Sequence, residues 1–440
     1  MAEALPLILF ASVFVLLLLG YPVAFTLGGV SIIFGIFTLG FTEFLALPSR
    51  IWGIMTNYVL IAVPLFIYMG VMLEKSGLAE NLLETMALLF GKLRGGLAIS
   101  VVIVGAMLAA STGIVGATVV TMGLLSLPTM LKRGYSPPLA TGTISASGTL
   151  GQIIPPSIVL VLLGSIMNVS VGDLFMGAVI PGFVLVFLYL GWIVVASIIK
   201  PDAAPAMPAE ELAKFHGAEM VKKIIQAFLL PFFLIAAVLG SIFAGIASPT
   251  EAAAVGAFGA TILTILQKKL SLPTLKAVMV ETTHLTSMVF IILVGATAFS
   301  LIFRGLEGDT YLTNLIIDAQ LGPHAFLALV MIVIFIAGFF IDFIEITFII
   351  VPVVVPIFVH LDINLLWLGI LIAMNLQTSF LTPPFGFALF YLKGVAPPEI
   401  TTAHLYKGII PFIVIQLIGL SLVIFFPEMA TWLPEVIIGN

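Results

Sequence analysis

A run of 37 residues without one charged side chain, from Gly95 to Leu131, constrains the fold more than any other stretch of the sequence. One membrane-crossing helix needs about 20 apolar residues. The run is therefore too long for a single crossing and suits two short crossings or one helical hairpin. Basic pairs flank it on both sides, at Lys92 and Arg94 and at Lys132 and Arg133. Because Lys and Arg favour the cytoplasmic side, both ends are expected there.

The middle of this run consists of small residues that favour a turn: Ser111, Thr112, Gly113 and Gly116. A turn at membrane depth exposes backbone groups that lipid cannot satisfy, so it must line a cavity within the protein. Broken helices of this kind mark the binding site of secondary transporters. The alternative is two ordinary crossings joined by a turn of small residues.

Composition places the chain among helical membrane proteins. Of its 440 residues, 61% are hydrophobic and only 8% are charged, whereas soluble domains carry about 25% charged residues. The chain has no cysteine, which excludes disulfides and Cys-ligated metals. No basic stretch points to a nucleic-acid partner. The expected fold is an all-α polytopic membrane protein.

Hydrophobic segments and breaks give the order of the first half. An amphipathic helix over residues 78–90 is expected along the membrane interface. A crossing over 139–167 carries two glycines and two prolines between Gly148 and Ser157, which should unwind it. The other expected segments are crossings at 5–19, 21–39, 51–73 and 175–199, with a loop holding Glu43 and Arg50 before the third, and a polar cytoplasmic linker at 200–223.

The second half repeats this order. Its expected segments are crossings at 224–244, 251–266 and 282–303, an interfacial helix at 311–321 and a hairpin-like run at 325–359. A shift of 228 residues aligns Pro128 with Pro356, and the Pro155 pair with the Pro383 pair. The second hairpin lacks Lys and Arg at its flanks, so it should open toward the opposite side. Two inverted-topology repeats follow.

The basic residues support this topology when the N-terminus is placed on the periplasmic side. Only Arg50 and Arg304 then lie outside, an asymmetry that agrees with the positive-inside rule. The other 14 of the 16 basic residues lie on the cytoplasmic side: Lys75, Lys92, Arg94, Lys132, Arg133, Lys200, Lys214, Lys222, Lys223, Lys268, Lys269, Lys276, Lys393 and Lys407.

Two acids near the middle of the second hairpin, Asp342 and Glu345, are candidate functional residues. They lie three residues apart, so they share one helical face. Ionisable groups at membrane depth are usually functional. The alternative is that the tip lies near an aqueous cavity and one acid only caps a helix end.

The second broken crossing is expected over Asn375–Pro384, facing the second hairpin tip. Its hydroxyl and amide oxygens, with unwound carbonyls, suit Na⁺, while exposed helix N-termini suit a carboxylate. The candidate Na⁺ ligands are Ser111, Gly113, Gly148, Thr149, Gly151, Gly338, Asp342, Asn375, Gln377, Thr378 and Ser379. The candidate substrate-binding residues are Ser111, Thr112, Gly113, Gly116, Gln152, Pro155, Asp342, Glu345, Thr382 and Pro383.

These motifs resemble a known family. The hairpin with Ser111-Thr112-Gly113, the break over Gly151–Ser157 and its counterpart over Thr378–Pro384 are similar to the large membrane subunit of tripartite ATP-independent periplasmic (TRAP) transporters, across essentially the whole chain. The resemblance implies Na⁺-coupled uptake of an organic acid in the bacterial inner membrane. It also implies a periplasmic substrate-binding protein and a separate small four-helix membrane subunit as partners.

In that family the hairpins and broken helices form a transport domain that moves as an elevator against a scaffold. The corresponding division here is scaffold and first arm helix at 1–92, transport domain at 93–170, a scaffold helix at 171–199, a linker at 200–223, scaffold and second arm helix at 224–322, transport domain at 323–395 and a C-terminal helix at 396–440. Rocking of two halves is the alternative motion.

Other functions fit the sequence less well. An intramembrane enzyme would need a nucleophile and base or a metal cluster, yet the five histidines are scattered and no HExxH motif occurs. An ion channel could use broken helices as a filter, but opposed hairpins favour alternating access. A symporter that needs no binding protein stays open as an alternative. The residues do not distinguish sialic acid from C4-dicarboxylates as the substrate.

The predicted orientation can be tested in this naturally Cys-free chain. A single cysteine placed in the 201–220 linker is expected to react with a membrane-impermeant maleimide only from the cytoplasmic side, because four of the cytoplasmic lysines lie in or beside this segment. Labelling from the periplasm in intact cells would overturn the whole orientation.

Overall fold

The computed structural model describes residues 4–113, 115–208, 221, 223–384 and 386–439, with backbone alone for residues 111, 112, 317 and 438. Within these ranges the regular structure is helical, which confirms the all-α prediction. The helices of the first half are α1 (Leu5–Leu18), α2 (Val23–Thr38), η2 (Phe41–Ala46), α3 (Leu47–Met55), η3 (Val59–Ile61), α4 (Ala62–Lys75), α5 (Leu78–Phe90), α6 (Gly96–Thr112), α7 (Val115–Lys132), α8 (Pro137–Thr149), η4 (Leu150–Gln152), α9 (Ile158–Met167), α10 (Val171–Ile199) and η5 (Pro201–Ala203).

The second half is also helical in its described residues. Its helices are the π-helical segment η6 (Ile225–Leu229), α13 (Leu230–Phe243), α14 (Pro249–Leu266), α15 (Leu272–Gly305), α16 (Gly308–Asp318), α17 (Pro323–Ala337), α18 (Phe343–Ile349), α19 (Val351–His360), α20 (Leu365–Leu381), α21 (Phe387–Val395), α22 (Thr402–Phe425) and α23 (Glu428–Ile438).

Long apolar helices dominate the described part of the chain. Six of them are long and apolar enough to cross a membrane, or eight if each of two bent pairs counts as one span. An all-helical solution is expected because each helix satisfies its own backbone groups, which lipid cannot do. The predicted polytopic class is thereby supported by length and composition.

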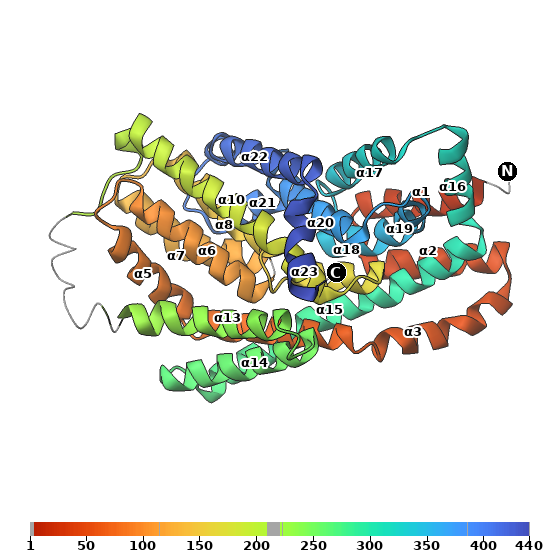
Figure 1. The fold of residues 1–440 in the computed structure, drawn as a ribbon, viewed down its shortest axis with the longest axis horizontal. Coiled ribbons are helices and arrows are strands. Elements are labelled where there is room, and N and C mark those ends of the chain that lie inside the picture. Colours follow the sequence, from red (N-terminus) through yellow and green to blue (C-terminus); the bar gives the residue numbers. More distant parts are fainter. Residues whose placement is uncertain (1–3, 114, 209–220, 222, 385, 440) are drawn as a thin grey trace.

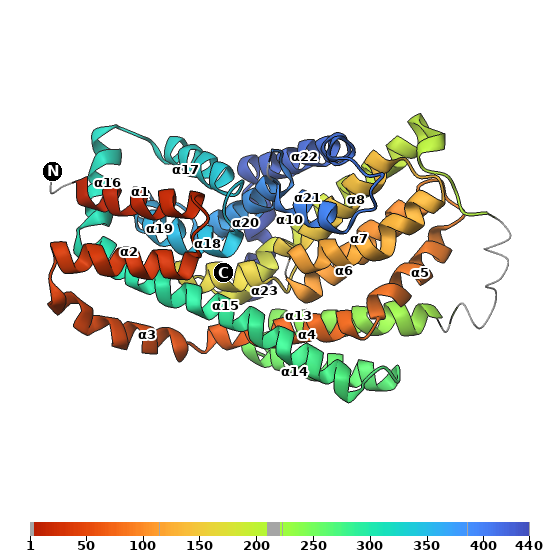
Figure 2. The ribbon, with the colours of Figure 1, turned by 180° about the vertical axis from the view of Figure 1, so that it is seen from behind.

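The helices pack in two groups. In the first, α15 lies against α2, α3 and α4, while α14 lies against α4 and α13. This group runs along one long side of the molecule (Figures 1 and 2). In the second, α8 packs against α6, α7 and α22, while α20 packs against α9, α10 and α22. The groups meet where α6 contacts α4 and α18 contacts α15.

A short helix precedes each hairpin, as predicted. The first, α5, buries Leu82, Leu83 and Met86 against neighbouring helices and leaves Glu80 and Glu84 exposed. Gly77 is the N-cap of α5 and Gly95 is the N-cap of α6, both with a left-handed φ, of 72° and 78°. Residues other than glycine adopt that conformation only at a cost in free energy, so glycine favours the turns before α5 and before α6. The second, α16, begins at Gly308, three residues before the predicted start.

The third crossing, predicted at 51–73, is not one continuous helix. The chain forms two segments that bend by 55° between α3 and η3, and α3 begins early enough that Arg50 is helical rather than in a loop. Asn57 lies at the bend. Its Oδ1 accepts a hydrogen bond from Val59 N at 2.9 Å, and its Nδ2 donates to Ser165 Oγ of α9 at 3.2 Å. Such side-chain bonds to the backbone compete with helix continuation.

Three further boundaries differ from the prediction. The crossing expected at 282–303 begins ten residues earlier, because Ser271 caps α15 by accepting a bond from Thr274 N. The crossing expected at 175–199 likewise begins at Val171, after the cap Ser170. The single C-terminal helix expected at 396–440 is two helices, since α22 ends at Phe425 and α23 starts after Pro427.

The start of the linker packs against the base of the first hairpin. Ala204 O accepts a hydrogen bond from Gly95 N at 2.9 Å, and Ala203 O accepts one from Ser136 N at 2.9 Å. Met207 N donates to Gly91 O at 2.8 Å. Residues 209–220 and 222 lie outside the described part, so the remainder of the linker stays a prediction.

The two halves meet in direct backbone contact where α8 crosses α22. A Cβ added to Gly142 would collide with the carbonyl oxygen of Gly408, and a Cβ on Gly408 would collide with that of Pro138. Such close approach between small residues is typical of packed membrane helices. The contact joins the first broken crossing to a helix of the other half.

We expect Gly142→Ala to destabilise the protein, because the obstacle is backbone that cannot move aside as a side chain would. The expected cost is about 1–3 kcal/mol, the usual range for overpacking, measured as a lower melting temperature of the purified protein. Gly191→Ala in α10 is the control, since no atom lies within 4 Å of its Cβ position. Equal melting temperatures for the two variants would contradict the close backbone contact between α8 and α22.

Candidate transport site

The first hairpin turns at Gly113, between α6 and α7. Gly113 has φ +62° and donates its N–H to Ala109 O at 2.9 Å. A Cβ there would lie 2.8 Å from Ile158 Cγ1 and 3.1 Å from Ile158 N. The tip therefore rests on the first residue of α9, inside the protein, as the hairpin interpretation requires. The side chains of Ser111 and Thr112 lie outside the described part of the structure.

The first predicted break is present. Helix α8 ends at Thr149, η4 follows, and α9 begins only after Ser157. Ser157 Oγ donates to Gln152 O at 2.7 Å, across the unwound segment. A Cβ on Gly151 would collide with the carbonyl oxygen of Ala109, so a small residue lets the break touch α6. Gly148 lies in the last turn of α8, closely packed on α7.

Gln152 is a buried amide with an incomplete set of hydrogen bonds. Its side chain is fully buried, and neither Oε1 nor Nε2 has a partner among the described residues. Leaving a buried polar group unpaired costs about 1–3 kcal/mol. An amide oxygen in this condition is suited to receive an ion, a water molecule or a substrate group. Pro155, in the same break, is buried and adds no donor.

Gln377 on α20 has the same property. It is fully buried, its amide makes no hydrogen bond of acceptable geometry, and it lies beside the Tyr189 hydroxyl. That hydroxyl accepts a bond from Gln416 Nε2 at 2.5 Å, and Gln416 Oε1 accepts one from Thr378 Oγ1 at 3.3 Å. A buried polar network thus links α10, α20 and α22.

The second hairpin turns between α17 and α18, and both candidate acids cap α18. Asp342 Oδ1 accepts a hydrogen bond from Phe343 N at 2.7 Å. Glu345 Oε2 accepts one from Asp342 N at 3.1 Å, which completes a capping box. Both acids therefore cap the helix end, as the alternative expected of one of them, and a further functional role stays a prediction. The two acids do not lie on one face of a continuous helix, because Asp342 precedes the first residue of α18.

The tip of this hairpin rests on α20. A Cβ on Gly338 would collide with Ser379 Oγ, and Asn375 Nδ2 donates to Met331 O of α17 at 2.7 Å. Each hairpin tip therefore packs against a broken crossing of its own half, as predicted. The amide nitrogen of Asn375 is used for this contact.

The predicted position of the second break was wrong. Residues 375–381 continue α20, and the helix is interrupted only between Leu381 and Phe387. Proline restricts the residue before it rather than the helix several residues earlier, so the unwound carbonyls lie near Thr382 and Pro383. One carbonyl in this interruption, Pro384 O, accepts a hydrogen bond from Tyr406 Oη at 2.7 Å.

The candidate hydroxyls already donate to their own helices. Thr378 Oγ1 and Ser379 Oγ donate to Met374 O and Leu376 O, both at 2.8 Å. The other two are Thr149 Oγ1, which donates to Ala146 O at 2.9 Å, and Thr382 Oγ1, which donates to Thr378 O at 2.8 Å. Each oxygen keeps lone pairs that can accept a bond or ligate a cation.

The four elements meet in one region. Gly116 in the first turn of α7 faces Tyr391 of α21, whose Cζ would lie 3.0 Å from an added Cβ. Helix α9 packs against α18, α19 and α20. The structure thus brings the first hairpin, both breaks and the second hairpin together. Sequence reasoning missed Tyr189 and Gln416; a glutamine within the otherwise apolar second half of α22 was the available signal.

Comparison with known proteins identifies the family. The family model described as "Tripartite ATP-independent periplasmic transporter, DctM component" matches residues 10–429. A C4-dicarboxylate TRAP transporter large permease protein of Vibrio cholerae is 30% identical over 98% of this chain and 98% of its own. A sialic acid TRAP transporter large permease protein of the same organism is 29% identical, over 96% and 97%.

A solved structure shares the fold. The YdaH transporter of Alcanivorax borkumensis superposes with a TM-score of 0.60 over 98% of each chain, at 14% identity. The prediction that the chain is not an enzyme is confirmed by its relatives, which are permeases. The match over nearly the whole length shows that this chain belongs to the large permease family of TRAP transporters and is a multi-span membrane transport protein.

Proposed function

We propose that this chain moves a small organic acid, of the C4-dicarboxylate or sialic acid type, across the bacterial inner membrane together with Na⁺. The observation that supports it is the meeting of two hairpin tips with two broken crossings around buried amides that lack partners. Two relatives carry these substrate classes in their names. A periplasmic substrate-binding protein would deliver the acid, and a small four-helix membrane subunit would complete the complex.

The Na⁺ sites are proposed at the first break and at the last turns of α20, before the second break. Neutral oxygens suit a hard monovalent cation, and the candidates are the amide oxygens of Gln152 and Gln377 with the unwound carbonyls nearby. One site lies between Gly113 and the first break, and the other between Asp342 and the second. No cluster of three His, Asp or Glu residues occurs in the described ranges, so the proposed sites rest on amides and carbonyls.

The substrate carboxylate is proposed at helix N-termini near the tips. The N-terminus of α18 is already occupied by the carboxylate of Asp342. The N-termini of α9 and α21 have no side-chain cap, so they are the better anion sites. Gly116, Pro155, Thr382 and Pro383 would then line the substrate, with Gln152 beside it.

The motion is proposed to be an elevator. Contacts of α10 and α22 with the hairpin and broken-crossing helices support a transport domain that includes 171–199, although the sequence assigned this segment to the scaffold. The first group of helices would form the scaffold, with α5 and α16 as arms. Thr121 Oγ1 of α7 donates to Glu74 Oε1 of α4 at 2.7 Å, across this boundary.

Reconstitution tests the function. In liposomes with its small subunit and loaded binding protein, the chain is expected to accumulate substrate against a gradient only when Na⁺ is present outside. Passive conductance would indicate a channel, and accumulation without a binding protein would indicate a symporter that works alone.

The ion sites can be tested without knowing the substrate. We expect Na⁺ to raise the melting temperature relative to equal K⁺, because a ligand bound only to the folded state stabilises it. Gln377→Leu should reduce this increase, because it removes an amide oxygen from one of the two proposed sites, and should leave the protein folded. A full Na⁺ effect in that well-folded variant would contradict the second site.

A matched pair separates capping from ion binding at Asp342. Asn caps helices as well as Asp does, whereas Ala loses about 1 kcal/mol. Asp342→Asn should therefore keep the melting temperature in K⁺ and show a smaller increase with Na⁺, while Asp342→Ala should lower the melting temperature in K⁺ and also show the smaller increase. If Asp342→Asn responds to Na⁺ as the wild type does, Asp342 is only a cap.

Cross-linking tests the elevator. Cysteines at Thr121 and Glu74, joined by a short bis-thiosulfonate reagent, are expected to abolish uptake until a reductant is added. The control pair replaces Lys75 and Glu281, whose ion pair of 2.9 Å joins two scaffold helices, α4 and α15. That cross-link should leave uptake unchanged. Normal uptake with the first pair fully cross-linked would mean that the hairpin does not slide past α4.

A further inference from the structure

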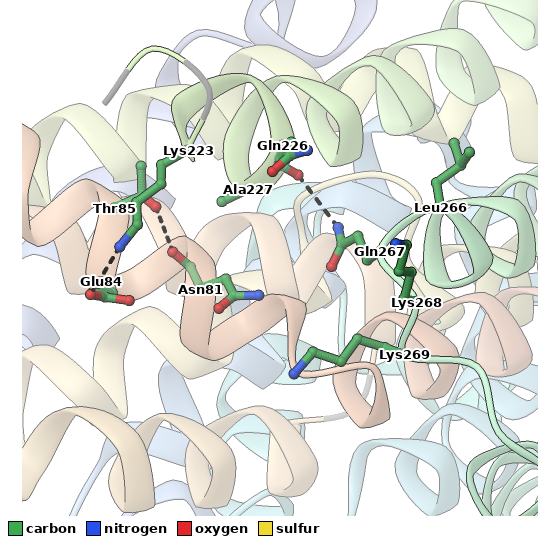
Figure 3. Close-up of a pocket in the computed structure, with 10 residues that line it drawn as sticks. All are labelled: Asn81, Glu84, Thr85, Lys223, Gln226, Ala227, Leu266, Gln267, Lys268 and Lys269. Atoms are coloured by element: carbon green, nitrogen blue, oxygen red, sulfur yellow. Dashed lines mark hydrogen bonds and ion pairs between the residues drawn. The ribbon is translucent and has the colours of Figure 1, made fainter. Parts of the chain in front are cut away.

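A cavity of about 370 Å³ lies away from the transport site, between α5, η6 and the C-terminal end of α14. Figure 3 shows polar and charged side chains from these three elements around one space. Asn81 and Glu84 come from α5, and Gln226 comes from η6. Lys268 and Lys269 follow the last turn of α14.

The charge around this cavity is unbalanced. Lys223 Nζ pairs with Glu84 Oε1 at 3.3 Å. Lys268 and Lys269 are exposed and have no ion-pair partner among the described residues. Among the described residues that line the cavity, three ammonium groups and one carboxylate therefore leave an excess of two positive charges, and the amides of Asn81 and Gln226 add neutral hydrogen-bonding groups.

The backbone fixes the place of both lysines. Lys268 has φ +58°, a left-handed conformation uncommon for residues other than glycine. Its N–H donates to Ile265 O at 2.8 Å, and that of Lys269 donates to Thr264 O at 3.1 Å. These bonds end α14 and hold two consecutive cations at the mouth of the cavity.

An exposed aliphatic wall adjoins the lysines, and of its residues Leu266 also lines the cavity. Ile265 is 52% exposed, Leu266 is 65% exposed and Ile225 is 44% exposed. They lie at the ends of two candidate membrane spans, 225–243 and 249–266. The cavity is thus placed where lipid headgroups meet hydrocarbon, with cations at the polar level and bare aliphatic surface below.

We propose that this cavity binds the headgroup of one anionic phospholipid, whose phosphate pairs with Lys268 and Lys269 while its acyl chains cover the aliphatic wall. A zwitterionic lipid would leave the two positive charges uncompensated. The bound lipid would join α5 to η6 and to the end of α14. It would therefore brace the first arm helix against the scaffold without taking part in substrate or Na⁺ binding.

Native mass spectrometry of the purified full-length chain, titrated with phosphatidylglycerol, tests this proposal. We expect one tightly retained lipid in the wild type and an apparent affinity at least about tenfold weaker in Lys268→Gln/Lys269→Gln, because each lysine near a membrane surface contributes several-fold to anionic lipid binding. Lys268→Arg/Lys269→Arg keeps both charges and should retain binding, which distinguishes lost charge from lost folding.

The control is Lys132→Gln/Lys276→Gln, which also removes two exposed charges but lies outside the cavity. It should bind like the wild type. Equal weakening in both glutamine variants would show only general attraction between charges and lipid. Equal retention of phosphatidylcholine, or displacement of the lipid by millimolar glycerol phosphate, would also overturn the proposal.

Discussion

Hydrocarbon offers no hydrogen-bond partner to an unpaired backbone group, so the irregular backbone segments of this protein must lie against other protein segments. Two crossings unwind, near Ile153 and near Thr382, and two hairpins turn within the protein. Each of these irregular segments rests on another helix rather than on lipid. Glycines at 113, 151 and 338 allow that contact, because any side chain there would hold the backbones apart.

The sequence predicted the large-scale order well because charge gaps and prolines are strong signals in a membrane protein. The uncharged run from Gly95 to Leu131 predicted the first hairpin, and the Pro155 pair predicted the first break. The bend at Asn57 was missed, since one side-chain hydrogen bond decides it and hydropathy does not register such a bond. The second break was placed too early because polarity at Asn375 was interpreted as unwinding.

The sequence predicted many residues of the candidate site but not which of them contact one another. Asn375 was expected to be a ligand, yet its amide nitrogen holds the second hairpin through Met331 O. Asp342 was expected to be functional, and its position before α18 makes it a cap as well. The link between Tyr189 and Gln416 spans 227 residues of sequence. Contacts over such separations follow from helix packing, which single-sequence periodicity does not contain.

The crossing of α8 and α22 also bears on how the chain is made. Gly142 is synthesised 266 residues before Gly408, its partner. At about 5–20 residues per second, roughly 13–53 s pass before that partner exists. During this interval the first half lies in the bilayer with its closest-packed surface uncovered. Until α22 is made, lipids or a membrane chaperone must therefore cover the surface of α8 around Gly142 that Gly408 later contacts.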